Sequence, residues 1–121
     1  MSTQDETTTV AELKALMDAF VAARDWRQFH DPKNLSASIA IEAAELMEHF
    51  QWVHSDALAA IREDPDQMAE IEEEVADILA YLVSFATTMK IDLAHALRAK
   101  MVKNEAKYPV DRYYGSFKPK L

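Results

Sequence analysis

Cysteine is absent from the 121 residues, and glycine occurs only once. Without cysteine the chain can form neither disulfides nor thiolate metal sites, and it has no thiol nucleophile. A sheet with many tight turns needs more glycine than this, whereas helices joined by short connections do not. Hydrophobic residues nevertheless make up 50% of the chain. The composition therefore predicts an all-α fold around one core, in a reducing compartment.

Long apolar runs and positive charge are also scarce. No run approaches the roughly 20 residues that cross a bilayer, and the polar start MSTQDETTT does not resemble a signal peptide. We therefore expect a cytoplasmic protein without a membrane partner. The net charge is -8, and the basic residues form no long stripe, which argues against duplex nucleic acid as a partner. An acidic protein can still bind an anion where metal ions bridge the two.

Apolar residues recur at helical spacing in four segments, and each segment begins with a helix start signal. The first signal is a capping box formed by Thr9 and Glu12. An aspartate followed by a proline begins the second and third segments, and Asp92 begins the fourth. We therefore expect a four-helix bundle over residues 9–28, 32–54, 65–89 and 92–109. Residues 1–8 are expected to be disordered and residues 110–121 to form an irregular tail, which leaves one domain over residues 9–109.

Two acidic pairs lie where the apolar and polar faces of neighbouring helices meet. On a helical wheel, Glu42 and Glu45 flank the apolar stripe of the second helix, and Glu74 and Asp77 flank that of the third. Four carboxylates in a half-buried seam repel one another, and a bound cation removes that repulsion. Oxygen ligands without cysteine or paired histidines favour Mg²⁺, with Mn²⁺ as the alternative. The competing interpretation is a solvated acidic face that binds nothing.

Lys100, Asn104 and Lys107 share one face of the fourth helix and offer cationic and amide donors. Phosphate oxygens suit such donors. The alternative is that the lysines only complement the partial negative charge at the end of a helix.

Aromatic residues beside polar ones offer surfaces on which a base can stack. The candidates are Trp26, Trp52 and Tyr81. Their competing role is to fill the core of the bundle. Reading the edge of a base needs polar groups as well, and the nearest candidates along the sequence are His30, Asn34 and His49.

Four sequences occur here in the order found in the MazG-like, all-α nucleoside triphosphate pyrophosphohydrolases: RDWRQFHDPKNL, EAAELMEHFQW, EEEVADILAYLV and KNEAKYP. The chain resembles this superfamily over about residues 10–109, and its dCTP pyrophosphatase branch in particular. The resemblance implies a Mg²⁺ site made of the two acidic pairs, a base pocket lined by the three aromatic residues, and phosphate contacts from the fourth helix. It also implies a homodimer or homotetramer with sites near the subunit contacts.

The resemblance implies a reaction as well. A (deoxy)nucleoside triphosphate, first of all dCTP or a modified dCTP, would be hydrolysed to the monophosphate and pyrophosphate, which cleanses the nucleotide pool. We expect Glu45 to accept the proton of the attacking water. Met17 stands where dCTP-selective members carry a histidine, so a preference for dUTP or a broader range of nucleotides is the alternative. A helical module that binds nucleotide or a protein partner without catalysis is the alternative from another class.

Overall fold

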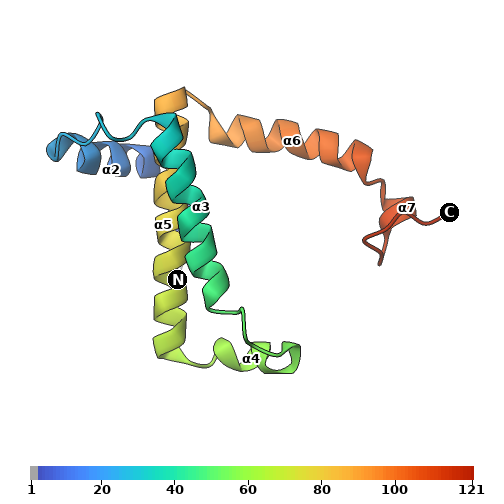
Figure 1. The fold of residues 1–121 in the computed structure, drawn as a ribbon. Helices are drawn as coiled ribbons and strands as arrows, with labels where there is room; N and C mark the ends of the chain where they lie inside the picture. The colour runs from blue at the N-terminus through green and yellow to red at the C-terminus, as the bar shows by residue number, and fades with distance from the viewer. Residues whose placement is uncertain (1–2) are drawn as a thin grey trace. The chain divides into compact units, whose positions relative to one another are not determined.

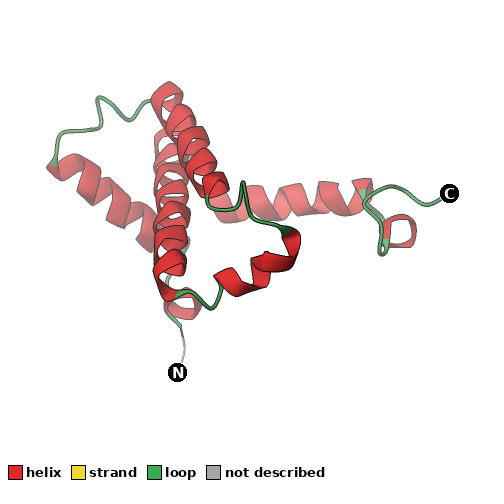
Figure 2. Cartoon of the chain, turned by 60° about the horizontal axis from the view of Figure 1, so that its bottom comes forward, coloured by secondary structure: helices red, strands yellow, loops and turns green. Residues whose placement is uncertain are grey.

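The computed structural model describes residues 3–121, and this part of the chain contains seven α-helices, one 3₁₀ helix and no strand (Figures 1 and 2). The predicted all-α class is thereby confirmed. The four long helices are α2 (Val10–Ala23), α3 (Pro32–Glu48), α5 (Pro65–Met89) and α6 (Leu93–Lys107). The short elements are α1 (Gln4–Thr7), η1 (Ser55–Ala57), α4 (Leu58–Ile61) and α7 (Val110–Tyr113). None of the helices within residues 3–121 has both the length and the apolar character of a transmembrane span.

The long helices begin where the sequence predicts, because a side chain caps each of them. Thr9 and Glu12 form a reciprocal capping box at the start of α2, with N···O distances of 3.1 and 3.2 Å. Asp31, Asp64 and Asp92 accept hydrogen bonds from backbone N–H groups in the first turns of α3, α5 and α6. A capping side chain satisfies backbone donors that have no partner inside the helix.

The helix ends differ from the prediction. The second long segment was expected to remain helical to residue 54, but α3 ends at Glu48 and residues 49–52 form turns. The N–H groups of Phe50 and Val53 bond to carbonyls three residues back. Likewise α2 ends at Ala23 rather than near residue 28. Asp25 adopts a left-handed conformation with φ of 54° there, so the chain turns away from the helix axis. Short helices also occupy parts of the two ends that were expected to be disordered or irregular.

The chain divides into two compact units, residues 3–90 and residues 91–121. In the first unit, α3 packs along α5, and α2 packs against α5 as well (Figure 1). The buried apolar side chains of this unit come from these three helices and from α4: Val21, Leu35, Ile61, Ile71, Val83 and Ala86. The second unit contains α6 and α7, and α6 has no buried residue. A bundle of four helices within one chain therefore stays a prediction.

Candidate metal centre and nucleotide site

Three of the four predicted metal ligands meet where α3 packs along α5. Glu42 and Glu45 come from successive turns of α3, and Glu74 comes from α5. One carboxylate oxygen from each of the three residues lies within 4.8 Å of the other two. Carboxylate oxygens at this spacing can share one hard divalent cation after small adjustments of their side chains.

Two oxygens of this cluster have no hydrogen-bond partner. Glu42 Oε2 and Glu74 Oε2 are both buried and unpaired among the residues that the structure describes. A buried carboxylate oxygen without a partner is unfavourable, whereas a hard cation offers it a ligand bond. The cluster is therefore suited to a divalent cation such as Mg²⁺.

Crowding of the carboxyl groups raises two pKa values. The pKa of Glu42 is raised to about 7, first because its carboxyl can share a hydrogen bond with Glu45 only when one of the two is protonated. Burial and the charges of Glu45, Asp77 and Glu74 add to this shift. Burial is the main cause that raises the pKa of Glu74, and the charge of His49 opposes it. Without a cation, the cluster therefore retains a proton near neutral pH.

Asp77, the fourth predicted ligand, lies one turn after Glu74 on α5 and outside the three-residue group. Its charge still raises the pKa of both Glu42 and Glu74, so it acts on the same cluster. Its role as a metal ligand stays a prediction. His49, considered from the sequence as a reader of the base, has its Nε2 atom 3.8 Å from Oε1 of Glu74.

Three of the residues predicted to bind the base, Trp26, His30 and Tyr81, form a chain of ring contacts in the first unit. The rings of Trp26 and His30 stack with 6.4 Å between centroids, and the His30 and Tyr81 rings lie 6.5 Å apart. Phe20 also contacts Trp26 edge-on, with 5.8 Å between the ring centroids. Trp52 is 85% exposed and takes no part in the ring contacts found among residues 3–121.

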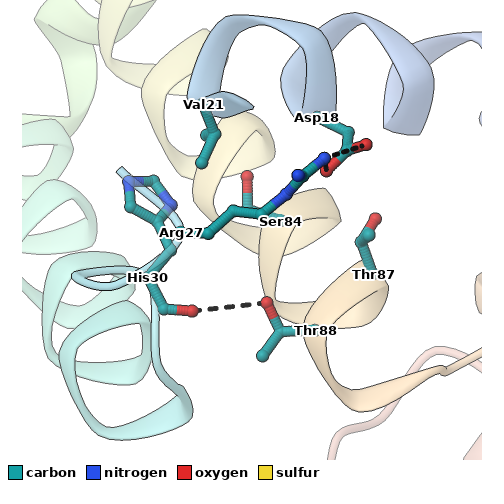
Figure 3. A pocket seen from close by; sticks show the side chains of 7 residues that line it. All are labelled: Asp18, Val21, Arg27, His30, Ser84, Thr87 and Thr88. Atoms are coloured by element: carbon teal, nitrogen blue, oxygen red, sulfur yellow. Dashed lines mark hydrogen bonds and ion pairs between the residues drawn. The ribbon is translucent and has the colours of Figure 1, made fainter. Parts of the chain in front are cut away.

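A cavity of about 300 Å³ lies beside His30 (Figure 3). It is lined by side chains from α2, from the segment that follows α2, and from α5: Asp18, Val21, Arg27, His30, Ser84, Thr87 and Thr88. The Arg27 side chain reaches Asp18, where its Nη2 atom donates to both carboxylate oxygens at 3.1 and 3.0 Å. Thr88 donates to the backbone carbonyl of His30 at 3.3 Å. Of the seven residues, only His30 was predicted from the sequence to belong to the site.

Two residues that line this cavity each carry a buried polar atom without a hydrogen-bond partner among residues 3–121, namely His30 Nδ1 and Ser84 Oγ. Ser84 is only 7% exposed. An unsatisfied buried polar group costs about 1–3 kcal/mol, so most such groups in proteins have a partner. A polar ligand that reaches the two atoms would therefore satisfy both of them.

The predicted phosphate-binding residues lie together on α6, in the second unit. Lys107 is in the last turn of the helix, and its Nζ atom lies 5.3 Å from the centre of the Tyr108 ring. The amide nitrogen of Asn104 contacts the sulfur of Met101 at 3.7 Å. These contacts suit a structural role for Lys107 as well as a phosphate contact, so the phosphate role of this helix stays a prediction.

The helical fold with an acidic cluster between two packed helices agrees with a comparison of the sequence with protein families. The model of the MazG-like family matches residues 37–117, which include Glu42, Glu45, Glu74 and most of α3. The chain belongs to the MazG-like family. The resemblance inferred from the sequence is thus confirmed.

Individual relatives agree with this assignment. The chain is similar to dCTP pyrophosphatase 1 of Bos taurus, with 39% identity over 108 residues that cover 89% of this chain and 64% of that protein. It is 38% identical to dCTP pyrophosphatase 1 of Homo sapiens, over 84% of this chain and 59% of the human protein. The chain thus spans less than two thirds of the length of these two relatives. A crystal structure of a pyrophosphatase from Archaeoglobus fulgidus has a TM-score of 0.77 and 43% identity, and the match covers 82% of this chain and 91% of that one.

Proposed function

We propose that this protein hydrolyses a nucleoside triphosphate to the monophosphate and pyrophosphate with Mg²⁺, and that dCTP or a modified dCTP is the preferred substrate. The observation that carries the proposal is the cluster of Glu42, Glu45 and Glu74 with its unpaired buried oxygens. A site that binds a divalent cation can also bind a triphosphate, because the cation offsets the repulsion between phosphate and carboxylate. Similarity to proteins named dCTP pyrophosphatase 1 supports the reaction and the base.

Glu42, Glu45 and Glu74 would hold the cation, with Asp77 beside them. When bound, the cation neutralises phosphate charge and lowers the pKa of water. Glu45 would take the proton of the water that attacks the α-phosphorus, at a carboxylate oxygen. This role suits Glu45 because both of the unpaired buried oxygens in the cluster belong to the other two glutamates.

Other side chains would bind the remaining parts of the nucleotide. The rings of Trp26 and Tyr81, joined through His30, offer a surface on which a base can stack. The donors of α6 would bind phosphate oxygens, and Trp52 would add an exposed stacking surface.

Release of pyrophosphate from a panel of common and modified triphosphates tests the proposal. We expect release with dCTP in Mg²⁺ and none in EDTA, and we expect Glu74→Gln to lower kcat/KM by at least roughly a hundredfold, since a cation ligand is lost. Glu48→Gln is the matched control, because Glu48 is an exposed glutamate of α3 outside the cluster. Release of orthophosphate instead of pyrophosphate, or no turnover of any triphosphate, would contradict the proposal.

A further inference from the structure

Ser84 lies on the same side of α5 as the acidic residues. Seven residues, which make two helical turns, separate Glu74 from Tyr81 and Asp77 from Ser84. The four side chains therefore follow one line along the helix. Seven residues of helix rise by about 10.5 Å, a length on the scale of the sugar and base beyond the α-phosphate of a nucleotide. The base of a nucleotide whose phosphates lie at the carboxylates would thus reach the level of Tyr81 and Ser84.

The cavity lined by Ser84 lies beside the contacting rings of Trp26, His30 and Tyr81. His30 takes part in both features, because its ring contacts Trp26 and Tyr81 while its side chain lines the cavity. Figure 3 shows His30 and Ser84 lining the cavity from different segments of the chain. Their buried atoms Nδ1 and Oγ have no hydrogen-bond partner in the described part of the chain. A ligand with a polar edge would satisfy both atoms, whereas an apolar ligand would leave both unpaired.

We propose that Ser84 is a specificity-determining residue of the base site, whose hydroxyl bonds the polar group at C4 of a pyrimidine. His30 Nδ1 is the second partner, at the neighbouring N3 atom of the ring. This inference rests on the proposed function. In a pyrimidine nucleotide C4 lies across the ring from N1, the atom that carries the sugar, so the group at C4 extends furthest into a cavity at the end of the site.

The chemistry of the two partners sets which bases they distinguish. A serine hydroxyl both donates and accepts, and Nδ1 of a neutral imidazole does one or the other according to the tautomer. The pair can therefore form hydrogen bonds with the amino group of cytosine as well as with the carbonyl of uracil or thymine. It favours pyrimidines with a polar group at C4 over a ring that lacks one, and it gives only a modest preference among the natural pyrimidines.

A double-mutant cycle between Ser84 and the 4-amino group of the base tests this role. The substrates are dCTP and the 2-pyrimidinone deoxynucleoside triphosphate, which lacks the amino group. We expect wild type to prefer dCTP by roughly fivefold to tenfold, the effect of one hydrogen bond, and Ser84→Ala to lose that preference. Ser84→Thr, which retains a hydroxyl, should keep most of it. Because the Ser84 hydroxyl has no hydrogen-bond partner within residues 3–121, Ser84→Ala should not lower the melting temperature.

Thr87→Val is the matched control. Thr87 lines the same cavity, but it is exposed and its hydroxyl already donates to the Val83 carbonyl at 3.1 Å. This variant should discriminate between the two substrates as wild type does. Equal discrimination by wild type and Ser84→Ala, or an equal loss in Thr87→Val, would overturn the assignment of Ser84.

A second measurement separates this assignment from the proposed reaction. If wild type turns over no triphosphate, the reaction is wrong, and calorimetric binding of dCMP then tests the base site in the same variants. Weaker binding of dCMP by Ser84→Ala than by wild type and Thr87→Val would support Ser84 as a base-binding residue. Equal binding by all three proteins, or no binding by wild type, would overturn this role together with the reaction.

Discussion

A carboxyl group held against other carboxyl groups binds a proton more tightly than it does in water, and Glu42 is such a group. Its pKa is raised to about 7 from an ordinary value of 4.5, so the folded protein binds this proton more tightly than the unfolded chain does. The resulting contribution to stability is complete below about pH 4.5 and is lost as the pH rises through about 7. A cation that displaces the proton restores the loss, and its affinity must therefore increase with pH.

For the protein in EDTA, we predict that the melting temperature falls as the pH rises from about 4.5 to about 7. Glu42→Gln should reduce this slope, since an amide does not titrate in this range. At pH 7, Mg²⁺ at a hundred times its dissociation constant should stabilise wild type by about 2.7 kcal/mol and the variant by less. Thermal melts over this pH range, with Glu48→Gln as the control, measure both effects. A flat profile in EDTA together with no response to Mg²⁺ would contradict the cluster as a cation site.

Side chains at the candidate site differed in how far the sequence could place them. Helical periodicity gives the position of a residue relative to the apolar stripe of its own helix. This was enough to predict that Glu42, Glu45 and Glu74 lie close together, as the structure shows. Trp52 was chosen for its ring type, yet it lies in a turn where helical periodicity no longer applies, and it is 85% exposed. The place of Ser84 in a cavity could not be predicted, because that cavity is also lined by Arg27 and His30, which lie beyond the end of another helix.

Among the helices, starts were predicted better than ends. A start depends on a side chain within three residues, as at Asp31, and such local contacts can be read from a sequence. The end of α2 depends on Asp25, whose N–H bonds Ala22 while that of Trp26 bonds Val21. Glycine usually occupies the left-handed position of this motif, so the helix end could not be predicted from an aspartate at that position. The early end matters for the site, because the chain turns at this point and Trp26 and His30 stack in the segment that follows.

The basic face of α6 permits a test of the phosphate role. If Lys100 and Lys107 make charged hydrogen bonds to the triphosphate, Lys100→Ala and Lys107→Ala should each lower kcat/KM. The expected decrease corresponds to a loss of about 1.5–3 kcal/mol of transition-state stabilisation. Melting temperatures should change little. Lys118→Ala is the control, because Lys118 is an exposed lysine outside this helix. Normal turnover combined with a lower melting temperature in Lys107→Ala would instead assign that lysine to the helix end and to the Tyr108 ring.

For the molecule as a whole, the apolar side chains that remain exposed to solvent indicate an interface with another subunit. On α5, Val75, Leu79 and Leu82 are 50%, 43% and 41% exposed, and their spacing of four and three residues places them on one stripe. In the second unit, Leu97 and Met101 of α6 lie four residues apart on one side of the helix and are 64% and 46% exposed. Apolar residues gathered on one side of a helix are typical of an interface between subunits.

We therefore expect the 13.7 kDa chain to form a homodimer or homotetramer in solution through the stripe of Val75, Leu79 and Leu82. Light scattering coupled to size-exclusion chromatography measures the mass. Leu79→Glu places a charge that must lose its water when the stripe is covered, so it should shift the population toward the monomer. Ala69→Glu, which adds the same charge to an exposed position of α5 away from the stripe, should leave the mass of the assembly unchanged. A monomeric wild type, or equal masses for Leu79→Glu and wild type, would show that this stripe does not hold the assembly together.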